Sequence, residues 1–541
     1  MHHYNIDKLT VRGDLLFGWG WFVGESPHGF PIALALQHED GHESTVVCLR
    51  SGRRDDVAAA FPEIKHAAES GFMIQGRVKD GSPIVSANLR LQPYGEGDSQ
   101  VSLDVPNIGQ LLSPDTYWSA TRASRALLRN GMIGTARIAS RRAGAAVRRS
   151  LRRLSFRSTA TRGATLIIDH DLGGGANVFR RQLVNRLRES GDVFILKPRV
   201  SSLDYEIEVH SAEGDSSAVY SDLKHLIAFL DDGEWSRLIV NELVSYPSPL
   251  KMVSWIKDRL SGSRRPSEAT LFLHDFYAVC PQWTLVGRSG VFCGIPDARE
   301  CSACMQTLRT PFLSYLEDPS VPDWRSQWLP LFQLCDVRAF SQSTVDIVRK
   351  AFPELHSKDM RVEPHSTDYF VSRKVDCSRN PGDFRIGVVG HISGPKGAAM
   401  VEAAAERIRE LGLPLSIVVI GSLESTRAGD RIIHAGTFTP ETLANKLEEY
   451  AVNACWIPSV CPETFSFVTS ELMALDVPVT CFDLGAPAER VSKYYRGRVI
   501  KDFDICAVLD HFMDMRDKLV ATHSESRPIA TKTPFNKAQS Q

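Results

Sequence analysis

The chain reads Cys461-Pro-Glu463-Thr-Phe465-Ser-Phe467-Val-Thr-Ser-Glu471 at the point that decides its fold. Residues 454–459 before this stretch and 477–486 after it are mainly apolar runs, which are typical of buried strands. The sequence therefore predicts a strand, a helix that carries two glutamates, and a second strand. We expect the Pro462-Glu463 pair to lead into this helix.

The spacing of Glu463 and Glu471 limits what their carboxylates can do. Along one helix, this spacing would separate them by roughly 12 Å on the axis and roughly 80° around it. A glycosidase needs two carboxylates about 5 to 10 Å apart across one bond, so two separate hydroxyl contacts fit better. The amides around Phe465 and Ser466 would lie at the helix start, where unpaired N–H groups attract anions. The alternative is a surface helix with solvated glutamates.

Strands and helices alternate in two successive parts of the chain. Such alternation predicts an α/β fold with parallel sheets that helices cover on both faces. We expect two Rossmann-like domains, at 163–370 and 371–523, with a cleft between them and a disordered tail at 524–541. The predicted strands and helices are 164–169, 177–189 (helix), 237–240, 269–273, 384–389, 398–411 (helix), 415–420, 440–450 (helix), 498–500 and 505–522 (helix).

Residues 1–112 have a different pattern, in which apolar and polar residues alternate between glycine and proline turns. This period of two predicts strands at 17–23, 31–36, 44–49, 71–78 and 86–91, and a short helix within 55–66. We expect a β-sandwich-like accessory domain. Trp19 and Trp21 would lie in its core, and the alternative is a glycan-binding surface.

A basic segment at 113–162 separates these two regions. No acidic residue occurs between Asp115 and Asp169, whereas twelve arginines do. Interspersed apolar residues would allow an amphipathic helix on an anionic membrane surface, and a solvated linker is the alternative. The aromatic platforms of single-strand binders are missing here, so we expect no nucleic-acid partner.

Composition places the chain among ordinary globular proteins. It has 541 residues, of which 43% are hydrophobic and 23% charged, and its net charge is −1. No apolar run reaches the roughly 18 residues that span a bilayer, and the first residues are too polar for a signal peptide. We expect a cytoplasmic protein, held at the inner face of the cell membrane if the basic segment binds lipid.

Eleven cysteines suit a reducing compartment, and their odd number argues against a complete set of disulfides. Four of them have the spacing Cys-x12-Cys-x7-Cys-x2-Cys, at Cys280, Cys293, Cys301 and Cys304. Four thiolates that end in a Cys-x-x-Cys pair would bind a structural zinc ion tetrahedrally. Free thiols or a redox pair are the alternative.

The central stretch resembles the retaining glycosyltransferases of family 4, which have the GT-B fold. The matching segments are Pro458-Ser459, Pro462-Glu463-Thr-Phe465-Ser466 and Glu471-Leu-Met473-Ala474-Leu-Asp476-Val-Pro478-Val479. Ser466 and Asp476 stand where that family usually has glycine. Residues 482–490 are similar to a segment of family members that assemble polysaccharides. The resemblance covers roughly 163–520.

The resemblance implies roles for individual residues. Glu463 would hold the hydroxyls of the sugar, Glu471 the ribose, and His274 the reacting sugar. The remaining donor-binding residues would be Gly173, Gly174, Gly175, His391, Lys396, Thr464, Phe465, Ser466 and Phe467. The family has an arginine where this chain has His391, and a mostly neutral imidazole holds a diphosphate less well.

The resemblance implies a hexosyl-type transferase that moves a sugar, with retention, from a nucleotide diphosphate donor to a glycan or lipid-linked acceptor. No cofactor would be required for catalysis. The pathway would be the biosynthesis of a cell-surface polysaccharide such as lipopolysaccharide. Two alternatives stay open, a nucleotide-sugar epimerase and a non-catalytic glycan-binding or assembly subunit.

Overall fold

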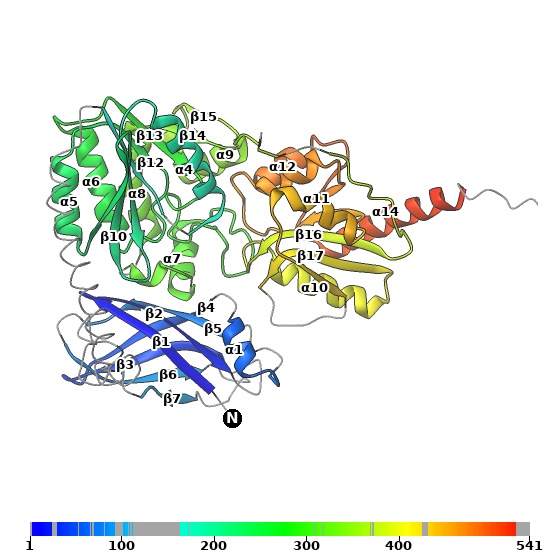
Figure 1. Cartoon of the computed structure of the whole chain (residues 1–541), viewed down its shortest axis with the longest axis horizontal. Coiled ribbons are helices and arrows are strands. Elements are labelled where there is room, and N and C mark those ends of the chain that lie inside the picture. The colour runs from blue at the N-terminus through cyan, green and yellow to red at the C-terminus, as the bar shows by residue number, and fades with distance from the viewer. Residues whose placement is uncertain are drawn as a thin grey trace, which may run out of the picture. The chain divides into compact units, whose positions relative to one another are not determined.

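The computed structural model describes most of the chain outside the basic segment. The described residues are 3–23, 30–51, 54–64, 67, 70–79, 82–91, 101–106, 108, 111, 163–170, 172–308, 310–316, 319–367, 369–370, 373–424 and 431–525. The predicted basic segment and most of the predicted tail therefore lie outside them. The chain divides into two compact units, Met1–His365 and Ser366–Gln541, which are described separately (Figure 1). None of the helices within the described ranges has the length and apolar character needed to cross a membrane.

The first unit begins with one antiparallel sheet of seven strands, ordered β1-β2-β5-β4-β3-β6-β7. A short helix, α1 (Asp55–Ala60), lies between the fourth and fifth strands. The strands are β1 (His3–Arg12), β2 (Leu15–Val23), β3 (Pro31–His38), β4 (Glu43–Arg50), β5 (Gly71–Arg77), β6 (Ile84–Leu91) and β7 (Ser102–Asp104).

The described strands form one continuous hydrogen-bonded ladder, and the β-sandwich-like packing of this domain stays a prediction. Period-two patterning identifies strands and their buried face but not whether a sheet divides. Here β5 pairs with both β2 and β4, so the ladder does not break. The Tyr4 hydroxyl donates a hydrogen bond to the carbonyl of Asp104, which joins the two edge strands. Trp19 and Trp21 are both partly buried; Trp19 packs against the core of the adjoining α/β part, and Trp21 packs against Phe61.

The α/β part of the first unit has eight strands, ordered β11-β10-β9-β8-β12-β13-β14-β15. The six from β9 to β15 are parallel, and the β10–β11 hairpin extends one edge in antiparallel fashion. The strands are β8 (Ala164–Ile168), β9 (Val193–Arg199), β10 (Asp204–Ser211), β11 (Gly214–Tyr220), β12 (Trp235–Val240), β13 (Glu268–Leu273), β14 (Asp336–Ala339) and β15 (Met360–Val362).

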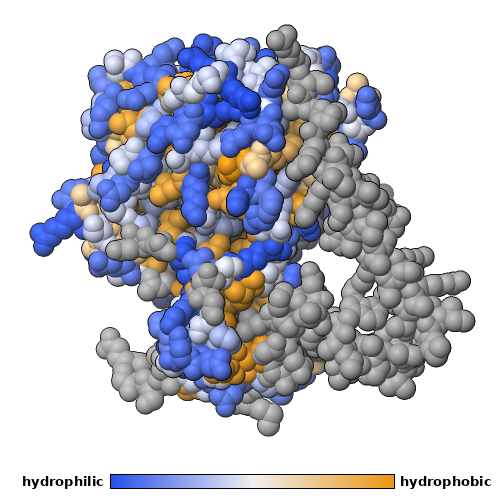
Figure 2. Space-filling view, turned by 90° about the vertical axis from the view of Figure 1, so that its left-hand side faces the viewer, coloured by the Kyte–Doolittle hydropathy of each residue, from blue (hydrophilic) through white to orange (hydrophobic). Residues whose placement is uncertain are grey.

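Helices accompany this sheet, and hydrophilic side chains cover much of the outer face on the side of α5 and α6 (Figure 2). Their inward residues, such as Leu226, Leu230, Met252 and Ile256, are fully buried. The helices are α4 (Gly174–Leu187), α5 (Leu223–Asp232), α6 (Pro249–Ser261), α7 (Ala298–Thr307), α8 (Val321–Leu334) and α9 (Gln342–Ala351), with short 3-10 helices at Leu313–Tyr315 and Pro353–Leu355.

Polar contacts hold the antiparallel sheet to the α/β part of its own unit. Arg12 forms an ion pair with Asp204 at 2.5 Å. Gln75, which is fully buried, accepts a hydrogen bond from the amide of Phe312 at 2.8 Å. Phe17 belongs to the large hydrophobic core of the α/β part. The sheet is therefore packed into the first unit rather than tethered to it.

The second unit has six parallel strands, ordered β18-β17-β16-β19-β20-β21. In chain order this is 3-2-1-4-5-6, the arrangement of doubly wound nucleotide-binding domains. The strands are β16 (Phe384–Ile392), β17 (Leu415–Leu423), β18 (Ile432–Gly436), β19 (Ala454–Ile457), β20 (Val479–Phe482) and β21 (Gly497–Ile500).

Two hydrophobic cores fill the two faces of this second sheet, and both contain alternate residues of its central strands. The predicted α/β class is therefore confirmed. The helices are α10 (Ala398–Leu411), α11 (Pro440–Glu449), α12 (Phe467–Ala474), α13 (Gly485–Val491) and α14 (Ile505–Glu525).

Candidate functional site

Open α/β sheets bind ligands outside the carboxyl ends of their strands, where the direction of winding reverses. In the second unit this point lies between β16 and β19, because the chain goes from β16 to β17 and β18 on one side and then returns to β19. Lys396 follows β16 and Glu463 follows β19. Their side chains meet there, with Nζ of Lys396 2.5 Å from a carboxylate oxygen of Glu463.

The Glu463 side chain is only 8% exposed, whereas that of Lys396 is 43% exposed. The Ser459 hydroxyl donates to the second carboxylate oxygen of Glu463. Burial would raise the pKa of Glu463, but the charge of Lys396 and these hydrogen bonds outweigh it and lower the pKa. Glu463 is therefore ionised at neutral pH, and Lys396 is its partly accessible counter-ion.

Two glycines let the backbone approach the turn that carries Glu463. Gly397, at φ 89°, lies so close to Pro458 that a Cβ would be 2.0 Å from its carbonyl oxygen. Gly485, at φ 65°, lies against Glu463 itself, where a Cβ would be 2.8 Å from the backbone nitrogen. The start of α10 and the start of α13 therefore enclose the turn from both sides.

Replacing Gly397 by alanine should destabilise the second unit by about 3 kcal/mol. Left-handed backbone costs alanine about 1 kcal/mol, and the contact with Pro458 adds the cost of overpacking, about 1–3 kcal/mol. Gly412 is the matched control because its φ is 60° and its added Cβ meets nothing within 4 Å. Chemical denaturation of Gly397→Ala and Gly412→Ala should differ by about 2 kcal/mol. Equal losses would contradict the close packing of the turn.

Arg490 of α13 also belongs to this site, although its sequence position did not indicate a role. Its guanidinium group donates to the backbone carbonyls of Phe465 and Ser466 and lies 4.4 Å from the centre of the Phe465 ring. Burial lowers the pKa of Arg490 to about 10, so it still carries its charge at neutral pH. The signal in the sequence that could have indicated Arg490 is its position after β20, within residues 482–490.

The helix that carries Glu471 begins at Phe467. Ser466 precedes it with φ 68° and ψ 92°, a conformation that no helix continues. Glu463 therefore lies in the preceding turn. Ser466 and Asp476 both have positive φ, at 68° and 58°, and these are the two positions where the resembling family usually has glycine.

Glu471 is buried within the second unit, and Tyr369 donates a hydrogen bond to it at 2.6 Å. Burial raises the pKa of Glu471, and the Tyr369 hydroxyl opposes this shift. The ring of Phe467 lies 6.2 Å from that of Tyr369 and 5.0 Å from that of Phe465. Glu471 is thus part of a cluster lined by aromatic rings. The role of Thr464 in binding the donor stays a prediction.

His391 lies at the end of β16 and contacts the end of β17. Its Nδ1 is 2.6 Å from the Ser422 hydroxyl and its Nε2 is 3.3 Å from a Glu424 carboxylate oxygen. The hydrogen bond to Glu424 raises the pKa of His391, against the opposing effects of burial and of Lys396. The imidazole is therefore protonated at higher pH than a free one, and it already has a carboxylate partner.

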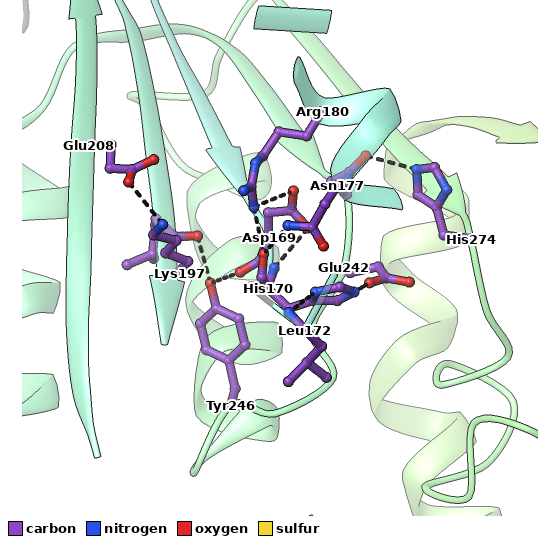
Figure 3. Close-up of polar contacts among 12 residues, drawn as sticks. Asp169, His170, Leu172, Asn177, Arg180, Lys197, Glu208, Glu242, Tyr246 and His274 are labelled. Carbon is purple, nitrogen blue, oxygen red and sulfur yellow. Dashed lines mark hydrogen bonds and ion pairs between the residues drawn. The ribbon is translucent and has the colours of Figure 1, made fainter. Parts of the chain in front are cut away.

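The first unit has its own polar cluster at the carboxyl ends of β8 and β12, where that sheet reverses its winding (Figure 3). Asp169 and His170 follow β8, and Glu242 follows β12. Asp169 is fully buried and forms an ion pair at 3.1 Å with Arg180 of α4. Arg180 also donates to the carbonyl oxygen of His170 at 2.5 Å, and Glu242 pairs with Nε2 of His170.

Proton positions in this cluster follow from the hydrogen bonds. The amide of Leu172 donates to Nδ1 of His170 at 2.9 Å, so the ring proton lies on Nε2 and points to Glu242. Burial, then the charges of Asp275 and Asp169, raise the pKa of Glu242 well above its usual range. Burial also raises the pKa of Asp169 and of Asp275 to about 6 each.

Asp169, His170 and Glu242 are the one group of three or more such residues within the described ranges whose ligand atoms lie within 4.8 Å of one another. A metal ion would need a lone pair from His170. Both ring nitrogens are already engaged, one as an acceptor and one as a donor. The cluster therefore fits proton-sharing side chains better than a metal centre.

His274 directly follows β13 and lies beside this cluster. Its Nε2 is 2.9 Å from the amide oxygen of Asn241, and its ring lies 4.5 Å from Phe340. Burial, and then the charges of His365 and His170, lower the pKa of His274 well below its usual range. His274 is therefore a neutral imidazole that donates Nε2–H to Asn241.

The glycines of the first unit lie where α4 begins, at Gly174 rather than at the predicted residue 177. Gly173 and Gly174 have φ of 84° and 77°, and a Cβ on either would meet nothing within 4 Å among the described residues. The backbone here is therefore open to close approach by a ligand. Gly175 lies within the first turn of the helix.

The four cysteines gather around α7. Cys280, Cys301 and Cys304 belong to one hydrophobic cluster, and burial raises the pKa of all three thiols. Cys293 is close enough to each of them to add to that shift. Their sulfur atoms are not a group within 4.8 Å in the part of the chain that the structure describes. The zinc site stays a prediction.

Most residues of the first-unit cluster were missed by sequence reasoning. Asp169 and His274 come directly after a buried strand, and His170, Glu242 and Asp275 are each the second residue after one. Because parallel strands end at one edge of the sheet, that position alone was a usable signal. Arg180 lies on a helix and could not have been paired with Asp169 from sequence.

No family model matches this chain. No curated protein matches it either. Three similar solved structures are Anabaena HepE with UDP and glucose (12% identity, TM-score 0.41, 67% of this chain and 91% of that one), pneumococcal O-GlcNAc transferase GtfA with UDP and GlcNAc (11%, 0.33, 62% and 63%), and a glycosyltransferase from Rickettsia africae (8%, 0.36, 66% and 89%). Because these likenesses are so distant, the proposals below rest on this chain's own residues.

Proposed function

We propose that this protein is a glycosyltransferase that moves a sugar from a nucleotide diphosphate donor to a glycan or lipid-linked acceptor. The observation that carries the proposal is the Lys396–Glu463 pair at the reversal point of a sheet with nucleotide-binding strand order. A diphosphate needs cations, and sugar hydroxyls need a fixed carboxylate. This pair supplies one of each within a single contact.

Around this pair, the second unit offers further groups for the donor. Arg490 holds the backbone at Phe465 and Ser466, directly before the first amides of α12. Unpaired N–H groups at a helix start favour a phosphate. In the proposed complex Lys396 holds the diphosphate, Glu463 a sugar hydroxyl and Glu471 the ribose.

The first unit supplies the proposed acceptor side. Because neutral His274 gives its one N–H to Asn241, it could act toward an acceptor hydroxyl only as a hydrogen-bond acceptor, through Nδ1. Reaction on one face of the sugar would form the bond from acceptor oxygen to anomeric carbon as the bond to phosphate breaks. The acceptor proton would pass to the leaving phosphate oxygen, so catalysis would rest on positioning and charge stabilisation.

The finer features belong to the same proposal. They are retention, the GT-B arrangement, a role in cell-surface polysaccharide assembly, a cytoplasmic location with peripheral membrane attachment through residues 122–162, and a structural zinc at the four cysteines. Metal analysis of the purified protein tests the last of these, and zinc well below one equivalent would end it.

A transfer assay tests the function itself. The full-length protein is incubated with a panel of nucleotide sugars and membrane glycan acceptors, and release of nucleotide diphosphate is measured with and without acceptor. Acceptor-dependent release is the expected result. Release without acceptor, or interconversion of the donor, would point to hydrolysis or epimerisation and contradict transfer.

A non-catalytic glycan-binding subunit is the second candidate, and the His391 contacts favour it. An arginine at this position would carry a fixed charge, whereas His391 is engaged by Ser422 and Glu424. The two candidates separate on turnover: a binding subunit would hold glycan but transfer no sugar from any donor in the panel.

If the donor binds as proposed, its affinity should depend on pH through His391. The protonated imidazole is favoured by Glu424, so its charge is present at low pH and is lost as pH rises through a pKa above 6.5. Donor affinity of the wild type should therefore fall between pH 6 and pH 9. The His391→Arg variant should bind the donor equally well at pH 6 and at pH 9, because arginine does not titrate in this range. Calorimetric titration with donor checks this, and a parallel fall in both proteins would contradict it.

A further inference from the structure

A pocket of about 260 Å³ lies in the first unit at the amino ends of the sheet's strands. The cluster of Asp169, His170 and Glu242 lies at the other end of the same strands. Gly163 precedes β8 and Trp235 begins β12 at its wall. Three arginines complete it: Arg259 in the last turn of α6, and Arg264 and Arg265 in the segment before β13. We call the cavity that these three arginines line the arginine pocket.

The guanidinium groups of Arg259 and Arg264 lie close together. Arg259 donates to the carbonyl of Asp231 at 3.3 Å and also to that of Gly233, and Arg264 donates to the same Asp231 carbonyl at 2.9 Å. Two cations that share one neutral acceptor repel each other. Burial, and then the charge of Arg264, lower the pKa of Arg259, as this arrangement requires.

None of the three arginines forms an ion pair within the described ranges, although the Asp231 carboxylate attracts Arg259 and opposes the fall in its pKa. The Asp231 carboxylate instead accepts from the indole of Trp255 at 2.8 Å. Glu234 also lines the pocket, but it pairs with none of the arginines. The pocket therefore has an excess of positive charge, which attracts anions.

Arg259 adds a second, independent observation. The residue is only 8% exposed, yet its Nε is buried and has no hydrogen-bond partner among the residues that the structure describes. A buried donor without an acceptor destabilises the fold. Guanidinium groups match the oxygens of a phosphate in geometry and charge, and several can share one phosphate.

We propose that the arginine pocket binds a phosphate group, from a free phosphate compound or from a phospholipid headgroup. The site lies in the first unit and shares no residue with the proposed donor site, so it stands independently of the proposed function. Its volume accommodates a phosphate with several waters, each of ~30 Å³.

The test replaces the two exposed arginines, because Arg259 also holds backbone carbonyls and its loss would disturb the fold. Arg264→Gln/Arg265→Gln is compared with Lys224→Gln/Lys251→Gln, which removes the same charge from exposed positions on α5 and α6 outside the pocket. All variants also carry Lys396→Gln, which weakens pyrophosphate binding at the donor site. Inorganic phosphate and pyrophosphate are titrated by calorimetry at constant ionic strength.

We expect the arginine variant to bind pyrophosphate at least tenfold more weakly than the parent protein, which carries Lys396→Gln alone. The lysine variant should bind pyrophosphate with the affinity of that parent. A second arm measures sedimentation with phosphatidylcholine vesicles, with and without about a third phosphatidylglycerol. Loss of vesicle binding in the arginine variant alone would identify a lipid headgroup as the source. Equal losses in both variants, or no difference from the parent in either arm, would overturn the proposal.

Discussion

Glu463→Gln should lower the rate of sugar transfer by about 100-fold or more while leaving the fold intact. Glutamine has the size of glutamate and keeps an acceptor for the Ser459 hydroxyl, but it lacks the charge that fixes Lys396 at 2.5 Å. The loss of one charge-assisted contact that acts on the reacting group has this magnitude. Release of nucleotide diphosphate at saturating acceptor is the measurement.

Glu449→Gln is the matched control, because Glu449 is exposed on α11 of the same unit. It should transfer at the wild-type rate. Thermal unfolding with and without donor separates binding from folding, since a ligand that binds the native state raises its unfolding temperature. If Glu463→Gln keeps more than half of the wild-type rate, Glu463 is not the sugar-binding carboxylate.

Arg180→Met should destabilise the first unit by about 3 kcal/mol at pH 8. The change leaves Asp169 fully buried without its cation, and breaking a buried ion pair typically costs about 3–5 kcal/mol. Methionine fills similar space, so the loss reports charge rather than packing. Arg181→Met, one residue along on the exposed face of α4, should cost less than about 0.5 kcal/mol.

The pH dependence of this effect has a definite sign. Burial raises the pKa of Asp169 to about 6, above its value of about 3.9 in an unfolded chain. The native state therefore holds the Asp169 proton more tightly, so this carboxyl lowers stability as pH rises from about 4 to about 6. Without Arg180 the pKa rises further, and the destabilisation should be larger at pH 8 than at pH 5.

The double variant Asp169→Asn/Arg180→Met tests whether the two side chains act as a pair. Removing both charges should recover most of the loss, because asparagine is cheaper to bury than an unpaired carboxylate. Denaturation curves of the four proteins give the coupling free energy directly. Additive losses would mean that Arg180 stabilises the unit through its contact with the His170 carbonyl instead.

Sequence patterning predicted the parallel sheets well because their strands are buried on both faces and read as continuous apolar runs. It predicted α10 at its observed bounds because Gly397 and Gly412 mark both ends. It did not fix the start of α12, since a Pro-Glu pair is compatible with a helix start and only the backbone at Ser466 delays the helix to Phe467. Alternation predicted the strands of the N-terminal sheet but does not reveal how they pair.

The candidate site was predictable in part for the same reason. Lys396 and Glu463 follow strands that the sequence makes visible, and they meet as two carboxyl-end residues should. Arg490 and Arg180 come from helices, and contacts of that kind depend on how a helix packs rather than on any local pattern. His391 was named from the sequence, but its partner Glu424 follows a different strand and was not.

The left-handed backbone at Ser466 and Asp476 shows that these two turns require a value of φ rather than a particular residue. Glycine is only the least strained residue that provides it. Asp476 provides it too, and its side chain accepts a hydrogen bond from the Tyr495 hydroxyl, 19 residues along the chain. A serine or an aspartate at such a turn therefore meets a constraint on backbone conformation that the type of residue alone does not reveal.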